Sequence, residues 1–454
     1  MNKLYKKVLA KITPAQGELV AEKKLVEEIR SKINKIEGKH SHLEWCGSSA
    51  RGTHLRGDRD LDLFVMFDKD LPAHDLEKEG LRIGKAIFRG HKWEMAYSQH
   101  PYIRGNIKGF DVEIVPSYIV PSGAEKQSAV DRTPFHNKYL LEKFSEEQKQ
   151  EARLLKQFLK GINAYGADLK NNSLPGYGVE LLIAHYSNFE NAIKWIAQMK
   201  PGFIVDFGSG EERAKVLFKK ENYPLIIIDP VDENRNVASA LSIEQFERIV
   251  LAAKLFLKTP DEKFFFPKDK KPWTKKRVRS MLAKKELIAI QGTFPKGTLP
   301  DIVWGQLRRF EKKARTQIHE KDFVVLRSDL WSDEKKVVLL IELEELNLQK
   351  SKKIKGPMAS DGENAKRFLE KKRKILSGPR VEEGRIVLEI EREETRAKKI
   401  LEEFIKTEKR EDKKAIRIML KSGKVLEEKD LIKAYKGEFA KYLSRYLEGK
   451  EVFE

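Results

Sequence analysis

The sequence contains one cysteine, Cys46, and no long apolar run among its 454 residues. A single thiol excludes an intrachain disulfide and a cysteine-rich zinc cluster, which favours a reducing compartment. No segment approaches the roughly 20 apolar residues that cross a bilayer, and the N-terminus lacks the apolar core and cleavage site of a signal peptide. The nine histidines show neither metal-ligand spacing nor a Ser-His-Asp arrangement. We therefore expect a cytoplasmic protein with no membrane partner.

The chain is strongly basic. It has 90 Lys and Arg against 70 Asp and Glu, a formal charge of +20, and 40% of its residues are hydrophobic. That hydrophobic share is enough for folded cores, and the length predicts about three domains. The excess positive charge favours a polyanionic partner, although a highly charged, heat-adapted surface would give a similar composition. The location of the charge has to separate these two explanations.

The spacing of apolar residues predicts an α+β protein with three domains. Helices at 16–36 and 73–90 alternate with strands, which predicts a mixed sheet with helices in a first domain over 1–145. A mostly helical second domain follows over 146–258, with one short strand near Asp229 and then a loop. The last domain, 259–454, alternates short strands with charged helices.

The stretch GSSARGTHLRGDRDLDLFVMF, residues 47–67, places two carboxylates at the start of an apolar strand. Asp60 and Asp62 alternate with leucines, so both project from one face of that strand. Neighbouring like charges repel unless a cation lies between them, and oxygen ligands suit Mg²⁺. Asp111 and Glu113 share the face of a later strand, and either could supply the third carboxylate that two metal ions need.

The turn before this strand suits a triphosphate. Gly47 allows the backbone to approach closely, while the Ser48 hydroxyl and neighbouring amides can receive phosphate. Arg51 can neutralise phosphate with two hydrogen bonds. Each motif alone is weak, because most Asp-x-Asp pairs are solvated turns, but the joint spacing favours a catalytic site.

The Gly-Ser, Arg and Asp-x-Asp arrangement resembles the nucleotidyltransferase superfamily that includes DNA polymerase beta and the poly(A) polymerases. Four later stretches, SAVDRTPFHNKYL, LLKQFLKGINAYGAD, GYGVELLIAHY and DPVDENRNVA, resemble the archaeal, class I CCA-adding enzymes, which are tRNA nucleotidyltransferases. The likeness continues through FVVLRSDLWSD and GPMASDGENAKRFLEKK and so covers most of the chain. It implies a polymerase beta-like catalytic head over 1–145, a nucleotide-binding neck over 146–258, and a tRNA-binding body and tail over 259–454.

The resemblance also implies roles for individual residues. Ser48 and Arg51 would bind the triphosphate, and Asp60, Asp62 and Glu113 would hold two Mg²⁺ ions. Glu113 stands where relatives are expected to carry Asp, so Asp111 remains a possible substitute. Arg235 would help to recognise the incoming base, and the remaining nucleotide-binding residues would be His136, Lys156, Tyr165 and Tyr177. Each residue also has an ordinary explanation that does not need the resemblance. His136 would be a loop histidine, Lys156 a solvent-facing lysine and Arg235 a loop cation. Tyr165 and Tyr177 would be core residues.

The implied reaction is untemplated addition of CCA to the 3′ end of tRNA from CTP and ATP, with release of pyrophosphate. The alternatives are a related poly(A) or 2′-5′ oligoadenylate polymerase, which shares the head chemistry, and an inactive RNA-binding homologue. A homodimer is possible. The product sequence separates the polymerases, and loss of the carboxylates separates an enzyme from a binding protein.

A basic run with aromatic neighbours follows the second domain. Positive charge interleaved with an aromatic ring suits RNA, although a solvated basic face explains such a run about as often. The predicted RNA-binding residues are Lys270, Lys271, Trp273, Lys275, Lys276, Arg277 and Arg279.

Overall fold

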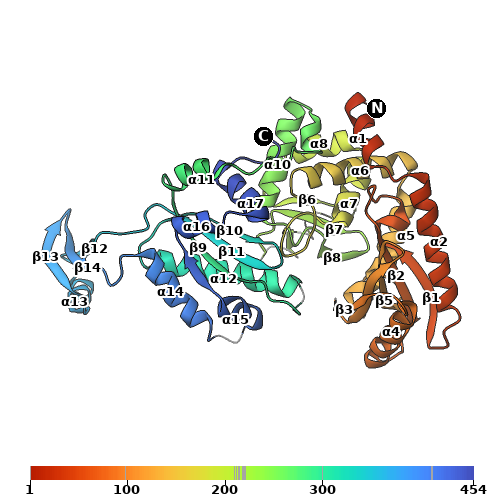
Figure 1. Ribbon diagram of the computed structural model, residues 1–454, viewed down its shortest axis with the longest axis horizontal. Coiled ribbons are helices and arrows are strands. Elements are labelled where there is room, and N and C mark those ends of the chain that lie inside the picture. The colour runs from red at the N-terminus through yellow and green to blue at the C-terminus, as the bar shows by residue number, and fades with distance from the viewer. Residues whose placement is uncertain are drawn as a thin grey trace. The chain divides into compact units, whose positions relative to one another are not determined.

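The computed structural model describes residues 2–97, 99–208, 210, 212, 215–216, 221–298, 300–410 and 413–454. The chain divides into two compact units, Met1–Asp269 with Glu451–Glu454, and Lys270–Lys450. Both units combine helices with sheets, which confirms the predicted α+β class (Figure 1). Over the described part of the chain, each helix is too short or too polar to cross a membrane.

A five-stranded sheet with the order β1-β2-β5-β4-β3 organises the first part of the first unit. The pair β2·β5 is parallel and the other pairs are antiparallel. The strands are β1 (His40–Cys46), β2 (Asp60–Asp68), β3 (Trp93–Tyr97), β4 (Pro101–Ile107) and β5 (Phe110–Ile119), and the helices are α1 (Lys3–Ile12), α2 (Gln16–Ile33), α3 (Gly47–Arg51) and α4 (Ala73–Ile87).

Alternation along β2 separates the two faces of this sheet. Leu61 and Leu63 pack with Ile29 of α2 and Ile83 of α4 in one buried cluster. Phe64 belongs to a second cluster on the opposite face. Because side chains alternate along a strand, Asp60 and Asp62 lie on the face that α2 and α4 leave uncovered.

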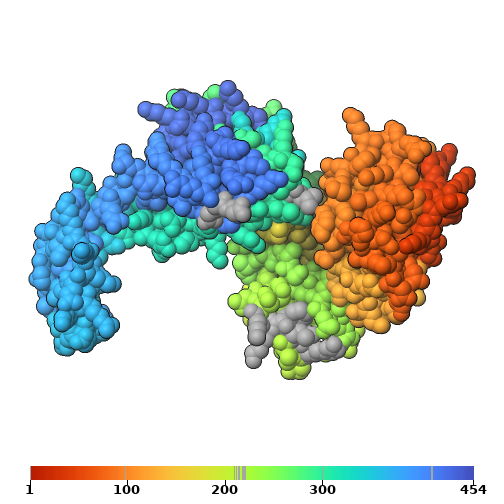
Figure 2. Space-filling model, turned by 90° about the horizontal axis from the view of Figure 1, so that it is seen from below, coloured from red at the N-terminus to blue at the C-terminus, as the bar shows by residue number. Residues whose placement is uncertain are grey.

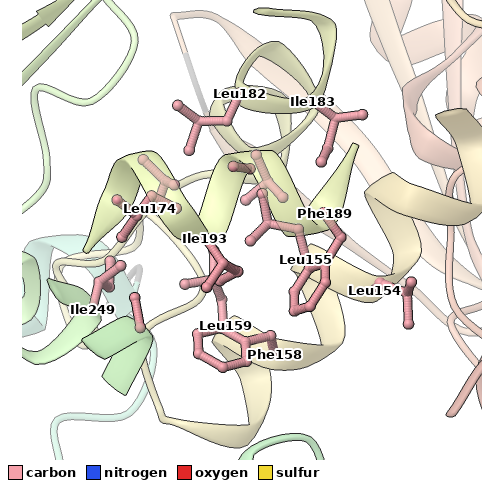
Figure 3. Close-up of a cluster of buried hydrophobic side chains, with 14 of the residues drawn as sticks. Leu154, Leu155, Phe158, Leu159, Leu174, Leu182, Ile183, Phe189, Ile193 and Ile249 are labelled. Carbon is pink, nitrogen blue, oxygen red and sulfur yellow. The ribbon is translucent and has the colours of Figure 1, made fainter. Parts of the chain in front are cut away.

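The rest of the first unit is mostly helical and surrounds one apolar core. Figure 3 shows side chains of this core, among them Leu155 and Phe158 of α6, Ile183 of α7 and Ile193 of α8. Val8 of α1 is buried in the same core. The elements are η1 (Ala129–Arg132), α5 (Thr133–Lys143), α6 (Glu146–Gly161), α7 (Gly176–Tyr186), α8 (Phe189–Ile196), β6 (Phe203–Val205), β7 (Leu225–Asp229), β8 (Asp232–Asn236), α10 (Ile243–Lys258) and η2 (Glu262–Phe264).

The prediction of a loop directly after residue 229 is wrong, because β8 forms there and pairs with β7. The Asn236 side chain explains why a polar segment forms a strand. Its amide nitrogen donates to the carbonyl of Leu225, while its oxygen accepts from the Ile227 amide. These bonds attach the segment to β7 without an apolar pattern of its own.

The second unit has a four-stranded sheet, β10-β11-β9-β15, that is buried on both faces. Along β9, Ile288 packs with α12, α14 and α15, whereas Leu287 packs with α11, α16 and α17. The strands are β9 (Glu286–Thr293), β10 (Val325–Ser332), β11 (Lys336–Leu343) and β15 (Lys424–Leu426). The helices are α11 (Lys275–Leu282), α12 (Pro300–Glu320), α14 (Ala397–Glu408), α15 (Lys414–Lys421), α16 (Glu428–Ala434) and α17 (Gly437–Glu448).

A small sheet with the order β12-β14-β13 forms a lobe within the second unit, drawn in light blue in Figure 2. Its central strand, β14 (Arg385–Glu391), carries the buried Val387 and Leu388, whereas the edge strand β13 (Ile375–Glu382) is exposed along nearly its whole length. The other elements are β12 (Ser351–Met358) and α13 (Gly362–Glu370).

Candidate active site

Two strands bring four carboxylates together. The parallel pairing of β2 with β5 places Asp60 opposite Asp111 and Asp62 opposite Glu113. The four side chains share one face of the sheet because both strands keep the same alternation. The structure therefore joins the predicted Asp-x-Asp strand directly to the predicted second carboxylate strand.

The charges in this cluster raise one another's pKa. Burial, with Glu113 and Asp60 nearby, raises the pKa of Asp62 to about 7. Burial also raises the pKa of Asp60, and Asp58 and Asp111 add to that effect. Burial raises the pKa of Glu113 against the opposing effect of Arg104. Protons are held more tightly here because burial and the neighbouring carboxylates outweigh the opposing charges of Lys160, Arg51 and Arg104.

The two candidates for the third carboxylate differ in their surroundings. Glu113 is half-buried and accepts a 3.4 Å hydrogen bond from the Tyr102 hydroxyl. Asp111 is exposed and accepts a 3.0 Å bond from the Asn106 amide. Glu113 therefore lies opposite the half-buried Asp62, whereas Asp111 lies at the solvent edge of the cluster.

A divalent cation fits this donor set. Within the described ranges, no three His, Cys, Asp or Glu side chains are grouped closely enough to form a metal site by themselves. The carboxylates nevertheless supply the oxygen ligands that hard divalent cations prefer. A bound cation would also relieve the repulsion that raises the pKa of Asp62.

Position 47 requires a glycine because its backbone lies very close to the Asp62 carboxylate. Its φ is +78°, and a Cβ atom there would lie 1.9 Å from Oδ2 of Asp62. Only glycine adopts that conformation without cost and leaves room for the carboxylate. Ser48 follows it in α3, so the predicted phosphate turn begins beside Asp62.

Arg51 and Lys156 meet at Glu180, which is fully buried. Arg51 Nη2 and Lys156 Nζ each lie 2.8 Å from a different oxygen of Glu180. The Thr53 hydroxyl also donates to Glu180. Burial alone would raise the pKa of Glu180, but Arg51 and Lys156 lower it to about 2. The solvent-facing alternative for Lys156 is wrong, because this side chain is 2% exposed.

A second buried carboxylate, Asp229, gathers three more predicted residues. Oδ2 of Asp229 lies 2.8 Å from His136 Nε2 and 2.9 Å from Arg235 Nη1. The Tyr177 hydroxyl donates to Oδ1 at 3.2 Å, and its ring stacks on His136 with centroids 4.1 Å apart. Burial would raise the pKa of Asp229, but His136 and Arg235 lower it to about 2. Arg235 is therefore paired with a buried carboxylate, and the loop-cation alternative is wrong.

The two clusters are connected through α5 and α7. Asn137, next to His136, accepts a 3.3 Å hydrogen bond from Arg51, and Glu180 follows Tyr177 by one helical turn. Tyr165 lies against the start of α7, where a Cβ at Gly176 would come within 2.7 Å of its hydroxyl. Burial raises the pKa of Tyr165, so this hydroxyl keeps its proton.

Sequence reasoning missed Glu180 and Asp229. Both lie inside apolar runs, GYGVELLIAHY and YPLIIIDP. Burying a carboxylate among apolar residues costs free energy unless cations pair with it. An acidic residue inside an apolar run was therefore the sequence feature that could have indicated a buried ion pair. The identity of the cations, however, depends on the packing of α5, α6 and α7.

The predicted RNA-binding residues lie in the second unit and are mostly exposed. Trp273 is half-buried: its amide donates to the Ser444 hydroxyl, and the Arg277 guanidinium stacks on its ring at 3.8 Å. Lys270 pairs with Glu448 at 3.0 Å. The structure therefore gives Trp273 a packing role in addition to any contact with RNA. Lys271, Lys275, Lys276, Arg277 and Arg279 are exposed.

Three family descriptions match successive parts of the chain. They are a nucleotidyltransferase domain over 22–136, the second domain of tRNA nucleotidyltransferase over 150–266, and the C-terminal domain of CCA-adding enzyme over 285–428. The first match confirms the predicted nucleotidyltransferase head.

Curated proteins that are similar to this chain over most of their length are CCA-adding enzymes. A CCA-adding enzyme from Methanosarcina mazei is 33% identical over 404 residues, which cover 87% of each chain. The CCA-adding enzyme from Methanocaldococcus jannaschii is 35% identical over 83% of this chain and 85% of its own. The one from Saccharolobus solfataricus is 34% identical over 88% of this chain and 92% of its own. This chain belongs to the family of CCA-adding enzymes.

Proposed function

We propose that the protein adds CMP, CMP and AMP in turn to the 3′ end of tRNA, using CTP and ATP and releasing pyrophosphate. The main support is the meeting of Asp60, Asp62 and Glu113 beside the Gly47 turn, in a chain of this family. The proposal keeps the division into a catalytic head over 1–145, a nucleotide-binding neck over 146–258, and a tRNA-binding body and tail over 259–454.

Asp60, Asp62 and Glu113 are the proposed ligands of two Mg²⁺ ions. Glu113 is preferred to Asp111 because it is half-buried beside Asp62, whereas Asp111 is exposed. When bound, the ions lower the pKa of the attacking 3′ hydroxyl and offset charge on the triphosphate.

The remaining residues hold the nucleotide. Gly47 and Ser48 receive the triphosphate, and Arg51 and Lys156 supply positive charge near it. Glu180 keeps these two cations in place before the nucleotide arrives. His136, Tyr165 and Tyr177 contact the nucleoside, and Arg235 contacts the base.

In the reaction, the 3′ oxygen bonds to the α-phosphorus, the bond from that phosphorus to the bridging oxygen breaks, and pyrophosphate leaves.

The product sequence tests the proposed reaction. A tRNA that ends at the discriminator base is incubated with all four NTPs and Mg²⁺, and the extended 3′ end is sequenced. We expect addition of C, C and A, after which extension stops. A poly(A) or 2′-5′ linked oligoadenylate product would instead assign the chain to a related polymerase.

The basic run at 270–279 is the proposed tRNA contact. Removing Lys275 or Lys276 should weaken binding of different tRNAs alike and reduce the slope of log K against log salt by about one for each lost phosphate contact. Filter binding over a salt series measures this slope. Lys194→Ala is the control, because Lys194 is an exposed lysine of α8 outside this run and should leave the slope unchanged. An unchanged slope for the lysine variants would show that the run is only a solvated face.

A further inference from the structure

We propose that Asp229 is a positioning residue that sets base selectivity, because it aims Arg235 and fixes the tautomer of His136. The inference rests on the proposed function, in which Arg235 contacts the incoming base. Asp229 itself is fully buried at the end of β7 and presents no atom to a nucleotide.

Every acceptor position of Asp229 is used. Oδ2 accepts from His136 Nε2 and Arg235 Nη1, and Oδ1 accepts from the Tyr177 hydroxyl and the Val231 amide at 3.2 and 3.0 Å. These donors come from α5, α7, β8 and the β7–β8 turn. One carboxylate thus fixes the relative positions of three side chains that are far apart in the sequence.

Arg235 combines a fixed end with an open end. One of its terminal nitrogens is held at 2.9 Å by Asp229, yet 31% of its side chain remains exposed. A guanidinium has five N–H donors in a rigid plane, so holding one nitrogen orients the others. The exposed donors can then meet a base in one orientation, which is what selectivity requires.

His136 is held in one tautomer by the same carboxylate. Burial lowers the pKa of His136, which favours the neutral ring. An ionised carboxylate can only accept, so the proton of the neutral ring lies on Nε2 and Nδ1 is an acceptor. Stacking on Tyr177 fixes the plane of the ring. Around Asp229, Arg235 therefore carries donor groups and His136 carries an acceptor, Nδ1.

Asp229→Asn tests the role of this carboxylate with little change of shape. The amide has one oxygen, which can accept two hydrogen bonds, and a nitrogen that cannot accept, so at least two of the four donors lose their partner. We expect the preferences for CTP over UTP and for ATP over GTP, measured as ratios of kcat/KM for single additions to tRNA, to fall by about tenfold or more. Arg235→Ala should cause a similar loss, and the double variant should lose no further selectivity, because both changes remove the same contact.

Asp232→Asn is the matched control. Asp232 is also buried on the β7–β8 hairpin, but it pairs with Lys126 and Arg132 at 2.6 and 2.8 Å. Its loss should lower stability and leave the base ratios unchanged. Asp229→Glu keeps the charge and displaces it by one bond, so it should lose less base selectivity than Asp229→Asn. It replaces Asp229→Asn in the test if that variant does not fold.

Binding measurements separate this inference from the proposed reaction. The affinities of the wild type and of Asp229→Asn for CTP and UTP are compared with Ca²⁺ in place of Mg²⁺, so no turnover is needed. If the wild type fails to add C to tRNA but Asp229→Asn still loses its CTP preference, the proposed reaction fails and the inference stands. Unchanged ratios in Asp229→Asn, additive effects with Arg235→Ala, or an equal loss in Asp232→Asn would overturn the inference.

Discussion

Replacing Asp60 and Asp62 together by alanine is expected to abolish nucleotide transfer and to leave tRNA affinity nearly unchanged. Both side chains lie on the face of the sheet that α2 and α4 leave uncovered, and Asp62 lies beside Gly47, so they carry the metal and not the RNA in the proposed site. The rate should fall about 10³-fold or more, because removing even one electrostatic group from an active site costs about 10²–10³. Single-turnover addition of CMP and filter binding of tRNA give the two quantities.

Asp68→Ala is the control for that experiment. Asp68 ends the same strand, is exposed, and accepts a hydrogen bond from the Asp70 amide. Its removal should leave turnover close to that of the wild type. Normal turnover in the Asp60 and Asp62 double variant would reject the metal assignment, and loss of tRNA binding would move these residues into the RNA interface.

The third carboxylate can be identified in the same assay. Glu113→Gln should lower turnover strongly, whereas Asp111→Asn should retain most of it. The difference follows from position, because Glu113 is opposite Asp62 and half-buried, while Asp111 is exposed and bonded to Asn106. The reverse result would make Asp111 the ligand.

The sequence was sufficient to predict the carboxylate strands but not their pairing. Alternation alone places Asp60 with Asp62, and Asp111 with Glu113, on shared faces. The choice between Asp111 and Glu113 needs the register of β2 against β5, which depends on how the two strands pack over α2 and α4. A local pattern contains no information on that packing.

The first helix shows a second limit of local patterns. In α1, Tyr5, Val8, Leu9 and Ile12 have helical spacing, so the helix itself was predictable although we did not predict it. Its partners were not, because these side chains join the core around α6 and α7 and not the nearby sheet. Strand β4, the segment PYIRGNI, was also missed, since it has little apolar alternation and forms by pairing with β3 and β5.

The nucleotide-binding residues were predicted by resemblance, whereas the carboxylates that hold them were not. His136, Lys156 and Arg235 could each be an ordinary loop or surface residue when read from the sequence alone. The structure brings them to Asp229 and Glu180, from which their charge and orientation can be derived. Contacts between α5, α7 and β8 are long-range, and no local spacing reveals them.

Glu180→Gln is expected to destabilise the first unit by about 3–5 kcal/mol, because breaking a buried ion pair leaves uncompensated charge. Arg51 and Lys156 would both lose their buried counter-ion. The midpoint of the first unit's urea transition should fall, and CTP affinity should fall with it, since the two cations would no longer be held in place. Adding Lys156→Met to this variant should recover stability without recovering CTP binding, because it removes one unpaired charge along with one phosphate contact.

The pH dependence of stability provides a separate measure of the same carboxylate. The pKa of Glu180 is about 2 in the folded protein, below the value of about 4.3 for an unfolded glutamate. Its stabilising contribution is therefore complete above about pH 4.3 and is lost as the pH falls towards 2. In Glu180→Gln this part of the acid-induced loss should be absent, so the stability difference between the wild type and the variant should shrink over that range.

Glu342→Gln is the matched control for Glu180→Gln. Glu342 is a buried carboxylate of the second unit that pairs with Lys285 and Arg327. Its loss should lower the second unit's transition and leave CTP affinity unchanged, whereas Glu180→Gln should lower both the first unit's transition and CTP affinity. If Glu180→Gln kept wild-type CTP affinity while the protein was destabilised, Glu180 would be a structural ion-pair partner only, and Arg51 and Lys156 would reach the triphosphate without it.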